Sequence, residues 1–146
     1  MPEPLRPGNM VPHFTLSTPE GFEIRVSNFR GRNSLVLIFT ASQWPALISD
    51  LLDREEALED EDAVVLVITP ENAKTRPAPQ PRNFHYLLDP GARVSQRFGA
   101  AHEPAVYLTD QYGEIYSVHR TSEGEALPEP DEILASLRHV NAACPE

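Results

Sequence analysis

The residues best placed for chemistry are Ser42, Gln43, Trp44 and Pro45, which come shortly after the apolar run 35–39. An uncharged run of this kind is typical of a strand buried on both faces of a parallel sheet. In an open α/β sheet, the loop at the carboxyl end of such a strand is where ligands usually bind. Ser42 has the one nucleophilic oxygen in this loop, but no nucleophile elbow surrounds it. We therefore interpret Ser42 as the cap of the following helix.

Cys144 is the one cysteine of the chain and stands close to its C-terminal end. A single cysteine excludes a disulfide within the chain, a metal site made of cysteines alone and a dithiol cycle. We interpret Cys144 as an inert thiol in a frayed end. An intermolecular disulfide or an accessory redox role is the alternative.

The histidines are scattered and lack the HxH or HExxH spacing of common metal-binding motifs. We therefore predict no metal site and no cofactor. The histidine of most interest is His102, because it stands close to Pro104 in a segment discussed below. The other histidines are His13, His85, His119 and His139.

The net charge of −10 argues against nucleic acid or an anionic membrane surface as the main partner, because both need cationic groups. No stretch reaches the roughly 18 apolar residues that a membrane helix needs. The first residues lack the apolar centre of a signal peptide. From these features we expect a cytoplasmic protein.

The first half of the chain predicts a β-hairpin followed by a strand–helix–strand unit. Residues 14–17 and 22–26 alternate across the turn Thr18–Gly21, and 35–39 and 63–68 are apolar strands. Between these two strands, apolar residues recur at helical spacing from Pro45 to the acidic cluster Glu59–Asp62, which predicts one helix. These residues are Leu47, Ile48, Leu51, Leu52 and Leu58.

The second half predicts one more strand, a short helix, a second hairpin and a final helix. Prolines at 77–81 restrict any helix there to about 71–75. Strands are expected at 86–88, 105–109 and 114–119, and a helix at 92–98 that Gly99 closes. Asp131 is predicted to cap the last helix, whose apolar face comprises Ile133, Leu134, Leu137 and Val140.

Four segments together resemble the thioredoxin-fold redoxins, nearest to the peroxiredoxin (alkyl hydroperoxide reductase/thiol-specific antioxidant) family. Residues 11–16, with Gly21 and 28–31, are similar to the family's N-terminal hairpin, and 35–39 with Trp44 to its central strand and active-site loop. Residues 86–99 resemble the strand and helix before its proline loop, and 104–115 resemble the hairpin after it. The resemblance implies an α/β fold: a thioredoxin-like three-layer sandwich with a mixed central sheet, helices on both faces and an N-terminal β-hairpin.

The departures from the family concern its thiol chemistry. The resemblance places the reactive cysteine directly after the tryptophan, where this chain has Pro45, and the resolving positions hold Leu47 and Ile48. Ser42 falls where the family keeps a hydroxyl residue. Because proline has neither a nucleophile nor an N–H, we exclude peroxide reduction at this loop.

The resemblance also implies that Pro104 is a cis-proline facing the loop Ser42–Pro45. The two residues before it are His102 and Glu103. A carboxylate at Glu103 would disfavour a thiolate, where a cation would stabilise one. His102, Glu103 and Pro104 are therefore expected to form the second half of the candidate site.

We therefore expect a single redoxin domain over residues 1–146, with an extended arm at 1–12. Its expected role is a non-enzymatic binding or regulatory module for a protein or small molecule at the former active-site loop. The alternative is a thiol oxidoreductase that acts through Cys144 or in trans with a partner. A third class is a metal or cofactor carrier that uses the scattered histidines. The resemblance also suggests a homodimer.

Overall fold

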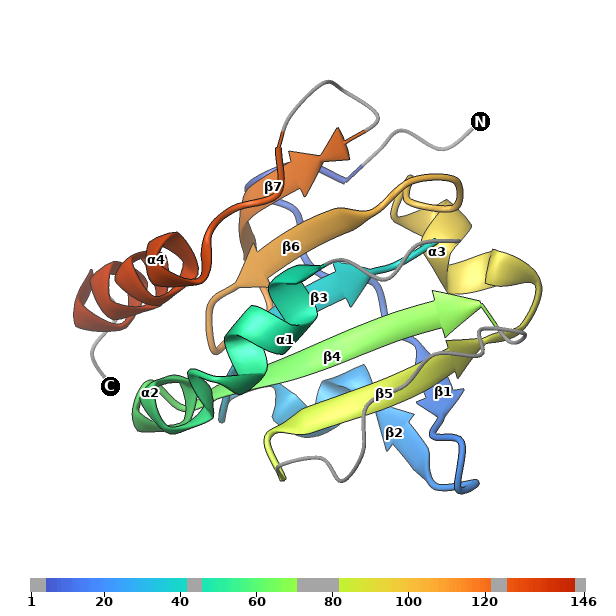
Figure 1. Cartoon of the computed structure of the whole chain (residues 1–146), viewed down its shortest axis with the longest axis horizontal. Helices are drawn as coiled ribbons and strands as arrows, with labels where there is room; N and C mark the ends of the chain where they lie inside the picture. Colours follow the sequence, from blue (N-terminus) through green and yellow to red (C-terminus); the bar gives the residue numbers. More distant parts are fainter. Residues whose placement is uncertain (1–4, 42–45, 71–81, 122–125, 144–146) are drawn as a thin grey trace.

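The computed structural model describes residues 5–41, 46–70, 82–121 and 126–143. These residues form a seven-stranded sheet in the order β2-β1-β5-β4-β3-β6-β7 (Figure 1). The strands are β1 (Thr15–Ser17), β2 (Glu23–Arg25), β3 (Ser34–Phe39), β4 (Ala63–Pro70), β5 (Phe84–Asp89), β6 (Ala105–Thr109) and β7 (Ile115–Arg120). The helices are α1 (Ala46–Leu52), α2 (Glu55–Asp60), α3 (Arg93–Arg97) and α4 (Pro130–Ala143), with 3-10 turns η1 (Val26–Phe29) and η2 (Pro90–Ala92).

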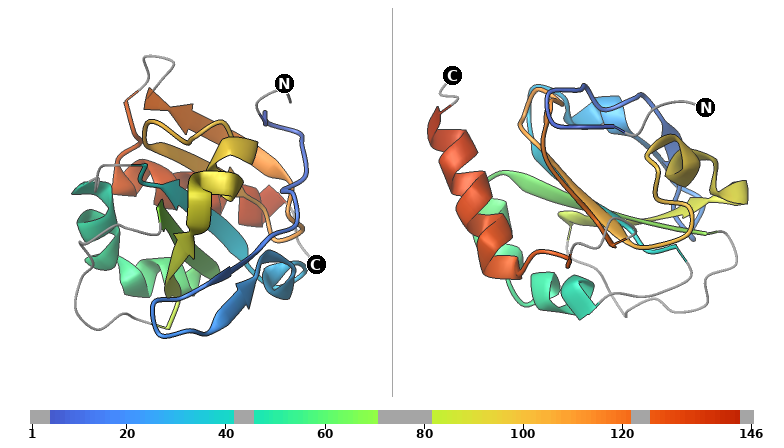
Figure 2. Two further views of the ribbon diagram at one scale, coloured as in Figure 1. Left: turned by 90° about the vertical axis from the view of Figure 1, so that its right-hand side faces the viewer. Right: turned by 90° about the horizontal axis from the view of Figure 1, so that it is seen from above.

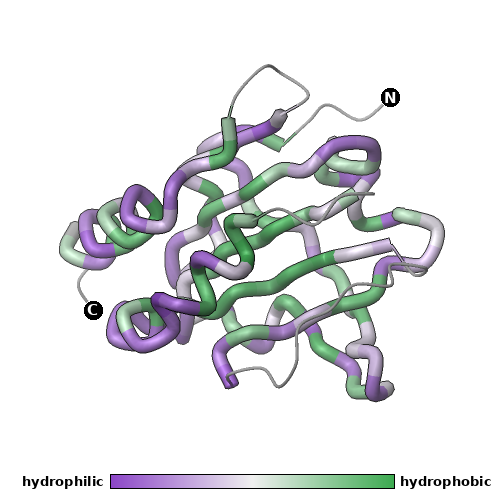
Figure 3. The backbone as a smooth tube through the Cα atoms, viewed as in Figure 1, coloured by the Kyte–Doolittle hydropathy of each residue, from purple (hydrophilic) through white to green (hydrophobic). Residues whose placement is uncertain are grey.

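The centre of the sheet is parallel, as the two apolar runs predict. β3 pairs with β4 from Ser34 opposite Ala63 to Phe39 opposite Ile68, and β4 pairs with β5 in the same direction. Every residue of β3 is buried. These strands form the continuous apolar band through the middle of the molecule in Figure 3. Burial on both faces explains why the runs are uncharged rather than alternating.

The two flanks of the sheet are antiparallel hairpins, both predicted. β1 and β2 pair across the turn that starts at Thr18, and β6 pairs with both β3 and β7. The register of β6 with β7 shifts between Leu108 and Thr109. The predicted order of hairpin, β-α-β unit, strand, helix, hairpin and helix is therefore confirmed.

Helices and other segments cover both faces of the sheet (Figure 2). On one face, α1, α2 and α4 pack their apolar side chains on alternate residues of β3, β4 and β6. On the other face, α3, η1 and residues of the N-terminal segment cover the remaining core. The predicted arrangement of a mixed sheet between two covering layers is confirmed. No described helix is long and apolar enough to cross a membrane.

The helix predicted from Pro45 to the acidic cluster is wrong in one respect, because it is two helices. α1 ends at Leu52 and α2 begins at Glu55, with Arg54 in a non-helical conformation between them. Leu51 of α1 and Leu58 of α2 are both fully buried on the same face of the sheet. Arg54 forms an ion pair with Asp131 of α4 at 3.1 Å.

Asp131 does not cap α4, contrary to the prediction. The helix begins one residue earlier, at Pro130, which suits its first position because proline has no N–H to leave unpaired. The Ile133 N–H donates to the Glu129 carbonyl, and the Glu129 N–H donates to the carboxylate of Glu132. Ile133, Leu134 and Leu137 are buried, as predicted, whereas Val140 is half-buried.

The N-terminal residues run along β7 from Gly8 to Val11. The Gly8 N–H donates to Ile115 O, and the Val11 N–H donates to Gly113 O. The expected cap at Ser42 and the expected short helix at 71–75 lie outside the described residues.

Candidate functional site

Three chain segments meet at one edge of the sheet, next to the candidate loop. Phe39, near the end of β3, lies opposite Ala105, the first residue of β6, and Ala105 lies opposite Arg120, the last residue of β7. The residues that follow β3, precede β6 and follow β7 are therefore neighbours. This register places Ala41, Pro104 and Thr121 at the same edge, although they are far apart in the sequence.

Ala41, the last described residue before the candidate loop, has a left-handed backbone. Its φ is 52° and its side chain is buried. A residue with a Cβ pays roughly 1–2 kcal/mol for this conformation. Strained residues of this kind are found where the surrounding structure fixes a turn, and they are common at functional sites.

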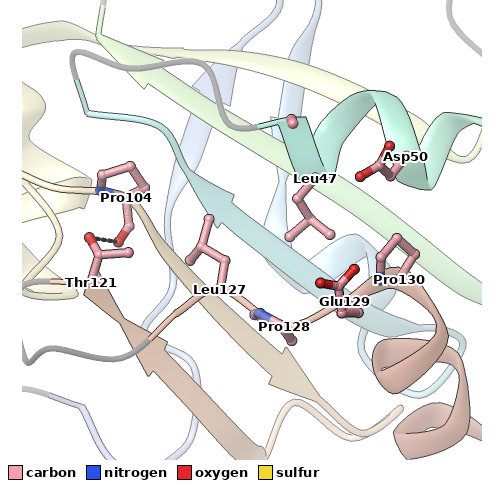
Figure 4. A pocket seen from close by; sticks show the side chains of 9 residues that line it. Leu47, Asp50, Pro104, Thr121, Leu127, Pro128, Glu129 and Pro130 are labelled. Atoms are coloured by element: carbon pink, nitrogen blue, oxygen red, sulfur yellow. Dashed lines mark hydrogen bonds between the residues drawn. The ribbon is translucent and has the colours of Figure 1, made fainter.

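A groove of about 340 Å³ lies between α1, the start of β6, the end of β7 and the start of α4 (Figure 4). We call it the Pro104 groove. Pro104 and Thr121 lie at one end and Asp50 and Glu129 at the other, with Leu47 and Leu127 between them. Its lining is completed by Ala46, Pro128 and Pro130. Its volume is at the low end of the range for ligand pockets, about 300–1,000 Å³.

Hydrogen bonds fix the end of the groove next to β6. The Thr121 hydroxyl donates to the Pro104 carbonyl at 2.9 Å, and the Thr121 N–H donates to the same oxygen at 3.2 Å. Pro104 itself is buried. These bonds tie the end of β7 to the residue before β6, so this wall of the groove is preorganised.

Of the site residues predicted from the sequence, only part can be located in the structure, and only part of those lie in the groove. Ser42, Gln43, Trp44 and Pro45 lie outside the described residues; the chain enters them at Ala41 and leaves them at Ala46, which lines the groove. Pro104 lines the groove, whereas His102 and Glu103 are exposed and are not among its lining residues. The structure thus places Pro104 in the groove, but not His102 or Glu103.

The expectation of a cis bond before Pro104 is wrong. The described residues contain no cis peptide bond, so Glu103–Pro104 is trans. The trans form is the lower in energy for an X–Pro bond by about 0.5–1 kcal/mol.

Cys144 lies outside the described residues, which end with α4 at Ala143. Asn141 of α4 accepts a hydrogen bond from the Ser34 hydroxyl at 3.4 Å and donates two bonds to Glu61. Ser34 is the first residue of β3, at the end of the strand opposite the candidate loop.

No group of three or more His, Cys, Asp or Glu side chains within the described ranges is arranged to hold a metal ion. His13 and His139 are exposed, and His119 on β7 is hydrogen-bonded to Ser117 at 2.8 Å. Burial lowers the pKa of His85, whose ring packs against Phe29.

Two tyrosines have shifted pKa values, and neither lines the groove. Burial raises the pKa of Tyr86 to about 12. Burial and the charge of Asp110 raise the pKa of Tyr116. Both shifts follow from packing on the strands and keep the phenols neutral, so they do not indicate acid–base chemistry.

Sequence reasoning missed most of the groove, including Asp50, Thr121 and residues 127–130. The one available signal was the proline pair Pro128 and Pro130, which marks an irregular segment before the last helix. That signal does not say which part of the sheet the segment crosses. The information comes from the antiparallel register of β6 and β7.

Comparison with known proteins agrees with this fold. The model of the AhpC/TSA family matches residues 7–118. A peroxiredoxin-named protein of Mycobacterium tuberculosis is 28% identical over 142 residues, which cover 93% of this chain and 90% of that protein. A similarly named protein of Haemophilus influenzae is 30% identical over 102 residues, 66% of each chain.

Solved structures show the same architecture. Mycobacterium bovis AhpC superposes with a TM-score of 0.74 at 19% identity, over 98% of this chain and 96% of that one. The lipoprotein thioredoxin Etrx1 of Streptococcus pneumoniae superposes with a TM-score of 0.64 at 23% identity, over 88% and 99% of the two chains. At these identities the likeness shows the fold, which is thioredoxin-like as predicted.

Proposed function

This chain belongs to the AhpC/TSA family, and from that premise we propose that it is a member without the family's thiol chemistry that binds a partner through the Pro104 groove. The observation that carries the proposal is Pro45, which stands directly after Trp44 where the resemblance places the reactive cysteine. A peroxidatic centre needs a thiolate as nucleophile, and proline supplies none.

Cys144 is the one cysteine of the chain, so any thiol chemistry of this protein must use it. A single cysteine cannot form a disulfide within the chain, so a redox role for Cys144 would need a second molecule. Such a role, as a thiol oxidoreductase, is the alternative function. It would make any redox activity of the protein depend on the Cys144 thiol.

The groove supports a binding role. It is concave and largely apolar, and the Thr121–Pro104 hydrogen bonds hold one wall in place. Pro104, which lines it, directly precedes β6, whose first residue pairs with Phe39 at the carboxyl end of the central strand β3. Open α/β sheets commonly bind ligands at such strand ends. The site that the family uses for chemistry is thus, in this chain, a candidate recognition surface.

The test is the rate of hydroperoxide consumption by the purified chain with dithiothreitol as reductant. Wild type and Cys144→Ser are compared with a cysteine-containing family member as the positive control. We expect both to match the protein-free rate. Enzymatic turnover that disappears in Cys144→Ser would support the alternative, and turnover that survives in it would overturn the exclusion of chemistry.

A further inference from the structure

The Pro104 groove has an uneven chemical character. Its centre and most of its wall are hydrocarbon, from Leu47, Leu127 and three prolines. Its polar side chains are Thr121, whose hydroxyl donates to Pro104, and the carboxylates of Asp50 and Glu129. Among the described residues that line it there is no lysine, arginine or histidine. The lining side chains therefore offer hydrogen-bond acceptors and apolar surface.

The two carboxylates line the same end of the groove. Asp50 comes from α1 and Glu129 from the residue before α4, and both lie at the same end of the groove (Figure 4). Both residues are exposed. Arg54, a described cation on this layer, is paired with Asp131 at 3.1 Å. Two negative charges beside an apolar floor favour a cation and disfavour an anion.

On this basis we propose that the groove receives a partner polypeptide segment that presents a lysine or arginine beside an apolar side chain. The apolar side chain would cover Leu47 and Leu127, and the cation would lie between Asp50 and Glu129. The methylene groups of a lysine or arginine can also pack on such a floor while the charge remains near water. This inference rests on the proposed binding role and adds to it the chemistry of the partner.

The same charges make acidic partners unsuitable. A carboxylate or phosphate placed at this end of the groove would face Asp50 and Glu129, and the prolines that line it have no N–H to donate. Like charges brought together at an interface are unfavourable. The groove should therefore discriminate by charge between ligands of the same size.

The experiment measures binding of three matched tripeptides to the full ¹⁵N-labelled chain by NMR titration at low salt. The tripeptides are acetyl-Leu-Lys-Leu-amide, its Gln analogue and its Glu analogue. We expect the lysine peptide to shift the amide resonances of Ala46, Leu47 and Leu127 and to bind several-fold more tightly than the glutamine peptide. The glutamate peptide should bind most weakly, and raising the salt should reduce the difference.

Variants locate the effect. Asp50→Asn and Glu129→Gln should each weaken the lysine peptide about two- to fivefold, the usual range for one exposed ion pair, and leave the glutamine peptide unchanged. Glu56→Gln, an exposed carboxylate of α2 outside the groove, is the matched control and should change nothing. Ala46→Phe, which fills the groove from an exposed position, should weaken all three peptides.

Two results would overturn the inference. Equal affinity for the lysine and glutamine peptides, with shifts at the groove, would show that the groove binds without selecting a cation; the proposed binding role would then stand. No groove shift with any peptide, or lysine-peptide shifts that persist in Ala46→Phe, would show that the groove does not receive such a segment. The proposed function has its own test, which is the separate measurement of hydroperoxide turnover. Enzymatic turnover there would contradict the proposed function, whatever the peptides do.

Discussion

The carboxylate of Asp89 should be a major determinant of stability, because it accepts hydrogen bonds from backbone N–H groups in the first turn of α3. It is 1% exposed. One oxygen accepts from the Val94 N–H at 3.0 Å, and the other accepts from the Ser95 N–H at 2.8 Å and the Ser95 hydroxyl at 2.7 Å. Between Asp89 and the helix, Gly91 and Ala92 both have left-handed backbones, with φ of 67° and 54°. The hydrogen bonds hold this turn closed.

The expected loss of stability follows from the hydrogen-bond donors that lose their acceptor when the Asp89 carboxylate is removed. Asp89→Ala strands two buried N–H groups and a hydroxyl that can rotate, and each unsatisfied buried donor costs about 1–3 kcal/mol. We expect a loss of about 3 kcal/mol, against a total of roughly 5–15 kcal/mol for a domain. Asp89→Asn should cost about 1 kcal/mol, because its oxygen still accepts one N–H and the Ser95 hydroxyl can accept from its amide.

The assay is equilibrium unfolding in urea, followed by circular dichroism at 25 °C. For Asp89→Ala the midpoint should fall by roughly 1–2 M if the slope is near 2 kcal/mol per M. Asp53→Ala, the same substitution at an exposed position, is the control and should stay within about 0.5 kcal/mol of wild type. If Asp89→Ala does not fold, Asp89→Asn and Ser95→Ala remain measurable. The reasoning fails if Asp89→Ala is no worse than Asp53→Ala, or if Asp89→Asn is worse than Asp89→Ala.

Two further predictions concern a backbone conformation and a titration. Asp62 is exposed and lies just after α2 with a left-handed φ of 54°, a conformation that glycine adopts without strain. Asp62→Gly should therefore stabilise the protein by about 0.5–1 kcal/mol in the same urea assay. Asp60→Gly, at the last residue of α2, is the control and should destabilise it. Burial lowers the pKa of His85 below its ordinary 6.5, so the unfolded chain takes up a proton there more readily than the folded one, and this contribution to stability is lost as the pH falls below about 6.5. His85→Gln should therefore lose less stability than wild type between pH 7.5 and pH 5; equal losses would contradict the assignment.

The central strands could be predicted from the sequence because burial on both faces requires an uninterrupted run of apolar residues. Residues 35–39 and 63–68 are uncharged, and the structure places them in β3 and β4. The break between α1 and α2 has no comparable signal in the sequence. Asp53 and Arg54 are ordinary residues for a helix, and Leu51 and Leu58 are seven residues apart, a spacing that also suits one face of an unbroken helix, so no pattern in this stretch indicates the interruption.

The candidate site could be predicted only in part, because its residues are close in space and not in sequence. Pro104 was found through a resemblance, and the structure places it in the groove. Glu129 and Thr121 join it only through the pairing of β6 with β7 and the path of the chain into α4. A pattern of spacing along one segment cannot show that a carboxylate of α1 and one just before α4 line the same groove.

The net charge of −10 also hides the property that matters most for the groove, which is where the charges lie. Acidic side chains concentrate on the layer of α1, α2 and α4, where Arg54, Arg82 and Arg138 are each paired with a carboxylate. Six further exposed arginines lie in the N-terminal segment, in β2, after η1 and in α3: Arg6, Arg25, Arg30, Arg32, Arg93 and Arg97. Because charges are screened beyond about 8–10 Å, a ligand in the groove experiences the acidic layer and little of the arginines opposite. Selection for a cation there should therefore follow Asp50 and Glu129, and should survive substitutions that change the net charge elsewhere.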